Sequence, residues 1–346
     1  MDPTRRDLKV DCLRTLGLLS IMLAHVSPPA TLFQLRTFDV PMMIFLSGMS
    51  YAIAKKSTVS YGQYLWSRFQ RLVIPVWIFL TIFLYSIKLF NITIFEFPID
   101  KQKIIESYFL YNGIGYVWIM GIFLLIAIFS PLYKSLAERS SNNMLGLSAL
   151  SCIVIISLII DPLQSYSFGY WITLVYNLSI SILSYGIMFI FGYQYSSLVK
   201  REKFFILATS LLLIFFIESV SYHFEKTIIT PQSTKYPPHS VYIFYSIFII
   251  IIMNEGLAKL MPLNNKKVTM LVTFVSSNTV WIYLLHIPIV EYMKHASHNM
   301  FFLTKWLIAV IMSVTLYYLQ RKWVLLLTMK IKNPKIAKFL IKSLTG

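Results

Sequence analysis

The chain has 346 residues, of which 57% are hydrophobic and 13% are charged, and its mean hydropathy is +0.68. This composition excludes a soluble globular domain, which could not bury so much apolar surface, and predicts an integral membrane protein. A net charge of +17 can indicate nucleic-acid binding, but here the basic residues collect between hydrophobic stretches, which is the pattern of membrane topology instead.

Hydrophobic stretches long enough to cross a bilayer as helices recur along the whole chain. We predict an all-α, polytopic membrane protein with about ten transmembrane helices in a single domain, 1–346. The first stretch carries charges and has no clear cleavage site, so we expect it to remain as a helix rather than be removed as a signal peptide. The predicted spans lie at about 10–27, 37–54, 73–94, 116–133, 144–160, 170–195, 204–220, 240–258, 271–290 and 304–320.

The basic residues predict the orientation of these spans. Most of the 31 Lys and Arg fall in alternate connecting segments and in the tail at about 321–346. Because cytoplasmic loops carry the excess of Lys and Arg, we expect both termini to be cytoplasmic and the protein to lie in the inner or plasma membrane. The basic tail is expected to contact anionic lipid.

The first predicted span carries Asp11, Arg14 and His25, which a lipid-facing helix avoids. At about 100° per residue the three lie on one side of the helix, so that side must face other helices or a wet cavity. Charges at membrane depth cost at least about 2.5–3.5 kcal/mol and are functional by default. We expect His25 to act as a general base. The alternative is that Asp11 pairs with Arg14 and His25 merely caps the outer end.

Arg68 and Arg71 lie one helical turn apart in a segment, at about 58–72, where aromatic and basic residues alternate. This segment is predicted to be an amphipathic helix at the cytoplasmic interface, followed by Pro75 at the start of the third span. Two guanidinium groups at this spacing suit a phosphate or pyrophosphate. The alternative is ordinary topology and binding of lipid headgroups.

Other residues carry weaker indications. Ser47 and Gly48 offer close helix packing or a hydroxyl that lines a site. Arg36 and Asp39 are placed to pair with each other, and His286 is a polar residue that bonds either a neighbouring helix or a ligand. Cys12 and Cys152 indicate neither a disulfide framework nor a metal site.

Taken in order, these motifs resemble the acyltransferase-3 family of integral membrane acyltransferases, and the likeness covers nearly the whole chain. The joint order is more specific than any single motif. The matching motifs are Arg6…Asp11-x-Leu13-Arg14 with His25, then Pro41-x-x-x-Phe45-Leu46-Ser47-Gly48, Arg68-x-x-Arg71-Leu72-x-x-Pro75, Val117-Trp118, and Ser277-Asn278-Thr279-Val280-Trp281-Ile282-Tyr283-Leu284-Leu285-His286.

The resemblance implies transfer of an acyl group, usually acetyl from acetyl-CoA, to a sugar hydroxyl of a surface polysaccharide or of its lipid-linked precursor. It implies catalytic roles for Arg14 and His25, and handling of the acyl donor by Arg68 and Arg71. With it we expect Asp11 in the catalytic set, Ser47 on the donor side, no metal and no nucleic-acid partner.

Two other classes of protein explain part of the sequence. A transporter or flippase of a lipid-linked sugar would account for the spans and the intramembrane charges, but we find no inverted repeat. A membrane sensor or scaffold would tolerate replacement of His25. Consumption of a thioester distinguishes the acyltransferase from both.

Overall fold

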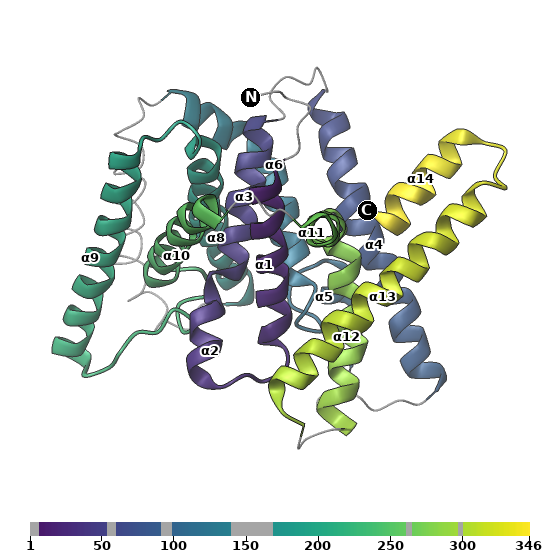
Figure 1. The fold of residues 1–346 in the computed structure, drawn as a ribbon. Helices are drawn as coiled ribbons and strands as arrows, with labels where there is room; N and C mark the ends of the chain where they lie inside the picture. Colours follow the sequence, from purple (N-terminus) through teal and green to yellow (C-terminus); the bar gives the residue numbers. More distant parts are fainter. Residues whose placement is uncertain (1–6, 54–59, 91–98, 140–168, 261–264, 297–299) are drawn as a thin grey trace. The chain divides into compact units, whose positions relative to one another are not determined.

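The structure is a computed structural model that describes residues 7–53, 60–90, 99–139, 169–260, 265–296 and 300–346. Within these ranges every regular element is a helix and no strand occurs, which confirms the predicted all-α class (Figure 1). The helices are α1 (Leu8–Ala24), α2 (Ala30–Leu35), the 3-10 helix η1 (Arg36–Phe38), α3 (Asp39–Ile53), α4 (Tyr61–Leu89), α5 (Lys101–Tyr108), α6 (Trp118–Arg139), α8 (Tyr170–Gln194), α9 (Lys200–Glu225), α10 (Ser240–Leu260), α11 (Lys266–Ser277), α12 (Thr279–Ala296), α13 (Phe302–Thr328) and α14 (Pro334–Thr345).

Several of these helices have the length and hydropathy of membrane spans. Among the described residues six helices qualify, and a bent pair, α11 with α12, raises the number to up to seven. The other qualifying helices are α4, α6, α8, α9, α10 and α13. The protein is therefore a multi-pass membrane protein, and these helices coincide with seven of the predicted spans.

The predicted count of ten spans is not confirmed. The stretch expected at about 10–27 forms a helix of only 17 residues, at the lower limit for crossing a bilayer. The stretch expected at about 37–54 begins in η1 and continues as α3, of which 15 residues are described, up to the end of the described range 7–53. Pro28 and Pro29 follow α1 closely, and proline disfavours helical geometry in the residue before it, which accounts for the early end of that helix. The span expected at about 144–160 lies outside the described residues.

The predicted interfacial segment and the third span form one continuous helix, α4. Ser60 caps it, because its side chain accepts a hydrogen bond from the backbone N–H of Gln63. Pro75 lies inside the helix without ending it. Twenty-nine residues extend about 43 Å, more than the roughly 30 Å of the hydrocarbon core, so one end of α4 must pass beyond the lipid tails.

The predicted span at about 271–290 is broken at Asn278. Helices α11 and α12 meet there at 83°. Asn278 closes α11 by donating from Nδ2 to the carbonyl of Phe274, and its Oδ1 accepts a hydrogen bond of 2.6 Å from the hydroxyl of Tyr317 in α13. A buried amide with partners on both sides of the break compensates for the helical hydrogen bonds that the bend removes.

The chain divides into two compact units, and the first comprises Met1–Gly17, Ala30–Ser57 and Ile128–Asn264. Its largest helix contact joins α3 and α8. A Cβ atom at Gly48 would overlap the backbone of α8 at Phe189, and one at Gly192 would overlap the backbone of α3 at Phe45. The packing role expected for Gly48 is therefore confirmed, because these two helices approach at glycines from both sides.

The second unit comprises Leu18–Pro29, Thr58–Ala127 and Asn265–Gly346. Helix α12 packs against α13 and α4, and α14 packs against the same two helices. The C-terminal end of α14 is held by side chains of α12 and α13, because the carbonyls of Ser343 and Leu344 accept hydrogen bonds from Trp281 and Gln320, respectively. The prediction of a single domain, 1–346, remains a prediction.

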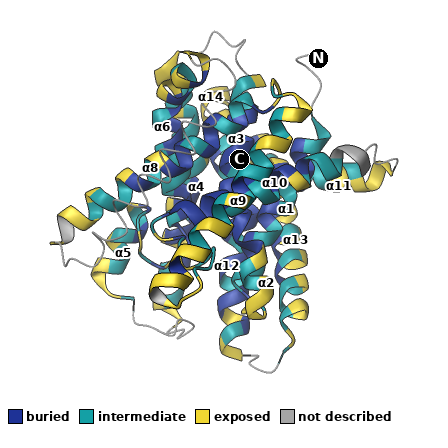
Figure 2. Cartoon of the chain, turned by 90° about the vertical axis from the view of Figure 1, so that its left-hand side faces the viewer, coloured by how far each residue is buried: buried dark blue, intermediate teal, exposed yellow. Residues whose placement is uncertain are grey.

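Exposure differs strongly between helices. Exposed residues, yellow in Figure 2, include large apolar side chains of α9 and α13, such as Phe215 and Ile311. On helices that can span a membrane these surfaces suit lipid rather than water. In α12, by contrast, half of the helix including the charged residue Glu291 is buried.

Candidate active site

The centre of the candidate site is a pair of histidines in the second unit. His25 follows the last residue of α1, and His286 lies in the middle of α12 with no exposed surface. Nδ1 of His25 lies 2.8 Å from Nε2 of His286, and the two rings stack at 17° with centroids 5.1 Å apart. His286 therefore bonds a neighbouring segment, and that segment is the one that carries the predicted general base.

The backbone of α12 determines which nitrogen of each ring carries the proton. Nδ1 of His286 contacts the carbonyl oxygen of Tyr283, which can only accept a hydrogen bond, so Nδ1 is the protonated nitrogen. In the neutral ring Nε2 then holds a lone pair and accepts a hydrogen bond from Nδ1–H of His25. The lone pair of His25 accordingly lies on Nε2, which is the atom able to take up a proton.

Two tyrosines and an ion pair surround the histidines. The ring of Tyr116 stands edge-on to His25 with centroids 4.7 Å apart, and the hydroxyl of Tyr283 donates to the carbonyl of Tyr116 at 2.7 Å. The hydroxyl of Tyr116 donates to Glu291, whose carboxylate also binds Nζ of Lys294 at 2.8 Å. Tyr116 thus links the ring of His25 to an ion pair whose carboxylate is buried.

Sequence reasoning missed this polar group. Glu291 is only 4% exposed although it is acidic, and it pairs with Lys294 one turn later in the same helix as His286. The sequence did contain an indication of this pair, namely an acidic and a basic residue three positions apart on an apolar helix. Ionisable residues within membrane helices are rare and are usually paired. Tyr116 and Tyr283 offered no such signal among the many aromatic residues.

The predicted catalytic residues Asp11 and Arg14 meet in the first unit. Their side chains lie 3.8 Å apart, and Nη2 of Arg14 donates to Oγ of Ser50 in α3 at 2.9 Å. Asp11 is buried, whereas Arg14 is half-buried. The alternative in which Asp11 pairs with Arg14 is therefore present as far as that pair is concerned. The hydrogen bond to α3 also gives the guanidinium group of Arg14 a fixed orientation.

The donor-side residues show different surroundings. The guanidinium of Arg68 lies 5.2 Å from the ring centre of Tyr64, one turn earlier in α4, and Arg71 is exposed. Oγ of Ser47 donates to the carbonyl of Met43 in its own helix at 2.9 Å. The predicted roles of these three residues toward an acyl donor remain predictions.

The expected pair of Arg36 and Asp39 is confirmed, at 2.7 Å, and a third charge joins it. Lys235, in the segment between α9 and α10, approaches the other oxygen of Asp39 at 3.3 Å, and all three side chains are buried. Burial lowers the pKa of Lys235, although the carboxylate of Asp39 acts in the opposite direction. Two cations around one carboxylate fasten this segment to η1 and α3.

A histidine pair in contact with tyrosines and an ion pair, in a chain with several helices long and apolar enough to span a membrane, defines a multi-pass membrane protein with a polar site. The acyltransferase-3 family model, described as an acyltransferase domain, matches residues 7–319. The chain therefore belongs to the acyltransferase-3 family, as its motifs predicted, and is a membrane acyltransferase. No curated protein and no solved structure matches it.

Proposed function

We propose that this acyltransferase moves an acetyl group from cytoplasmic acetyl-CoA to a sugar hydroxyl of a cell-surface polysaccharide or of its lipid-linked precursor, with His25 as the general base. The observation that carries the proposal is the hydrogen bond from His25 to His286, because it leaves the lone pair of His25 on Nε2. A base must present an unprotonated nitrogen in a defined direction, and this bond supplies both conditions.

The chemistry that follows is acyl transfer by direct attack. Nε2 of His25 takes the proton of the sugar hydroxyl while the oxygen attacks the thioester carbonyl. The carbon–sulfur bond then breaks, and the thiolate recovers a proton from the imidazolium of His25. His286 accepts the hydrogen bond from Nδ1 throughout, which stabilises the positive charge that develops on His25.

The remaining predicted residues receive roles consistent with their charge. Arg68 and Arg71 provide two cations one turn apart for the phosphates of coenzyme A, with Ser47 on the donor side. Arg14 steadies the donor or the developing negative charge, and Asp11 orients Arg14 through their ion pair. Cytoplasmic termini and an inner-membrane location follow from the distribution of basic residues. Membership of the acyltransferase-3 family favours this function over the transporter and the scaffold.

The test uses purified protein, radiolabelled acetyl-CoA and a membrane glycolipid extract. We expect His25→Ala to bind coenzyme A normally and to lose turnover by about 10²- to 10⁴-fold, the usual contribution of a general base. Arg68→Ala and Arg71→Ala should weaken coenzyme A binding instead.

His223→Ala serves as the matched control, because His223 is an exposed histidine of α9. It should leave binding and turnover unchanged. Wild-type turnover that survives in His25→Ala would overturn the assignment of the base, and wild-type protein that binds no coenzyme A would overturn the donor.

A further inference from the structure

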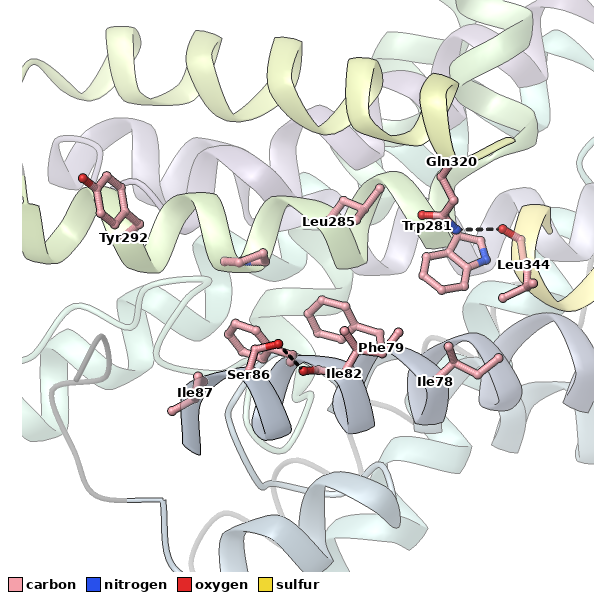
Figure 3. Close-up of a pocket in the computed structure, with 12 residues that line it drawn as sticks. Ile78, Phe79, Ile82, Ser86, Ile87, Trp281, Leu285, Tyr292, Gln320 and Leu344 are labelled. Carbon is pink, nitrogen blue, oxygen red and sulfur yellow. Dashed lines mark hydrogen bonds between the residues drawn. The ribbon is translucent and has the colours of Figure 1, made fainter. Parts of the chain in front are cut away.

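An apolar pocket of about 620 Å³ lies within the second unit, among α4, α12, α13 and α14. Figure 3 shows the side chains of α4 and α12 facing one another along it, with Gln320 and Leu344 at one end and Tyr292 at the other. Its volume falls within the roughly 300–1,000 Å³ of small-molecule sites. The lining residues are Ile78, Phe79, Ile82, Phe83, Ser86, Ile87, Trp281, Leu285, Pro288, Tyr292, Gln320 and Leu344.

Three of the polar side chains of the lining form hydrogen bonds within the protein. Ser86 donates to the carbonyl of Ile82, Trp281 donates to that of Ser343, and Gln320 donates to that of Leu344. What these side chains present to the pocket is therefore mainly hydrocarbon. An occupant gains from burying an apolar chain there, whereas a sugar or a nucleotide would lose its hydrogen bonds to water.

The pocket and the histidine pair use different faces of α12. At about 100° per residue, the four lining residues of α12 fall within roughly 60° of one another, and His286 lies roughly 130° from their mean direction. Tyr283, which contacts His286, lies still further round the helix. An apolar chain in the pocket is therefore not the group that reacts at His25.

Two lysines of α14 lie close in the chain to Leu344, which lines one end of the pocket. Lys338 and Lys342 lie one turn apart on α14, and Lys342 precedes Leu344 by two residues. Burial lowers the pKa of Lys342, and the positive charges of Arg71 and Lys338 lower it further, so each of these two cations lies close enough to Lys342 to repel it. An anion at this point relieves that repulsion.

The form of α14 places these lysines for contact with a membrane surface. Asn333 caps the helix and Pro334 occupies its first turn, so it begins sharply after α13. Its apolar residues, among them Leu340 and Leu344, alternate with lysines in the pattern of an interfacial amphipathic helix. Such helices lie at the level of the lipid headgroups, above the hydrocarbon that α4 and α12 cross.

We propose that this pocket is a binding site for one anionic phospholipid, with an acyl chain between α4 and α12 and the phosphate against Lys338 and Lys342. The bilayer supplies such a molecule at the required depth, and the charge at the end of the pocket selects an anionic headgroup. The bound lipid holds α14 against α4 and α12 and takes no part in acyl transfer.

The test is native mass spectrometry of the purified protein in detergent, with phosphatidylglycerol and phosphatidylcholine of identical acyl chains as probes. We expect tighter binding of one phosphatidylglycerol. Lys338→Gln with Lys342→Gln should weaken its binding by about 30-fold, since each lysine near an anionic headgroup contributes about 1 kcal/mol. The matched control, Lys330→Gln with Lys332→Gln, removes two charges from the preceding connection, outside α14, and should change little.

A second pair of variants tests the apolar part of the site. Ile82→Trp fills the pocket and should abolish retention of either lipid, whereas Leu89→Trp, on an exposed position of α4 outside the lining, should not. Equal affinity for the two lipids, or unchanged binding in Lys338→Gln with Lys342→Gln, would overturn the proposal. Displacement of phosphatidylglycerol by coenzyme A would also overturn it, because Lys338 and Lys342 would then bind the acyl donor. None of these outcomes depends on turnover.

Discussion

At the scale of single residues, the position of His286 decides which nitrogen of His25 can act as a base. Without a neighbour, the neutral ring of His25 could carry its proton on either nitrogen. The carbonyl of Tyr283 fixes the tautomer of His286, and His286 fixes that of His25. This is the logic of a base held in orientation by a third group, here with a neutral ring in place of a carboxylate.

His286 is therefore expected to act as a positioning residue. His286→Ala should lower kcat by about 10- to 100-fold, the cost of a misplaced reacting group, and leave KM for acetyl-CoA nearly unchanged. Its pH–rate profile should also change, because Nδ1 of His25 loses its acceptor. The measurement is steady-state kinetics across pH.

His239→Ala is the comparison, since His239 is also a buried histidine but belongs to the first unit. It should not produce the same separation of kcat from KM. If His286→Ala lowers both parameters only in proportion to the amount of folded protein, its role is structural and the positioning role is wrong.

At the scale of elements, the sequence predicted helices well where they are long and uniformly apolar. It failed where local chemistry interrupts or extends a helix. Asn278 breaks one predicted span because its amide bonds both α11 and α13, and the partner Tyr317 is 39 positions away. In α4, by contrast, Pro75 does not separate an interfacial segment from a span.

The contact of α3 with α8 gives a prediction at this scale. Gly48→Ala and Gly192→Ala should each destabilise the protein by about 1–3 kcal/mol, because the added methyl group would meet the backbone of the facing helix. The measurement is the change in Tm of each variant relative to wild type, from thermal unfolding in detergent.

Gly256→Ala supplies the control, since a Cβ atom there has no neighbour within 4 Å. It lies in α10 and should be neutral or stabilising by roughly 0.5–1 kcal/mol, because alanine favours a helix more than glycine does. Equal effects of the three substitutions would show that close packing of α3 and α8 does not limit stability.

At the scale of the whole molecule, topology links the number of spans to the distribution of charge. Both termini on one side of the membrane require an even number of crossings. The described helices supply six candidate spans, or up to seven, and the span expected at about 144–160 lies outside the described residues. The positive-inside pattern predicts the side of each connection independently of that count.

Single cysteines introduced into a variant lacking Cys12 and Cys152 test this orientation. Lys200→Cys and Lys332→Cys should react with a membrane-impermeant maleimide only after the membrane is opened, because the distribution of basic residues assigns both positions to the cytoplasmic side. Lys101→Cys and Lys226→Cys should react in intact cells. Labelling of Lys332→Cys in intact cells would place the C-terminal tail outside and contradict the predicted topology.

Taken alone, the sequence determined that this protein is an all-helical, multi-pass membrane acyltransferase, because hydropathy and the order of short motifs are local properties of the chain. It also singled out His25, and it left His286 open between a helix and a ligand. Only the tertiary structure decided that these two histidines bond each other, 261 positions apart, and that Tyr116, Glu291 and Lys294 surround them. Such contacts depend on how the helices pack against one another. A single sequence does not indicate which distant residues will meet when they do.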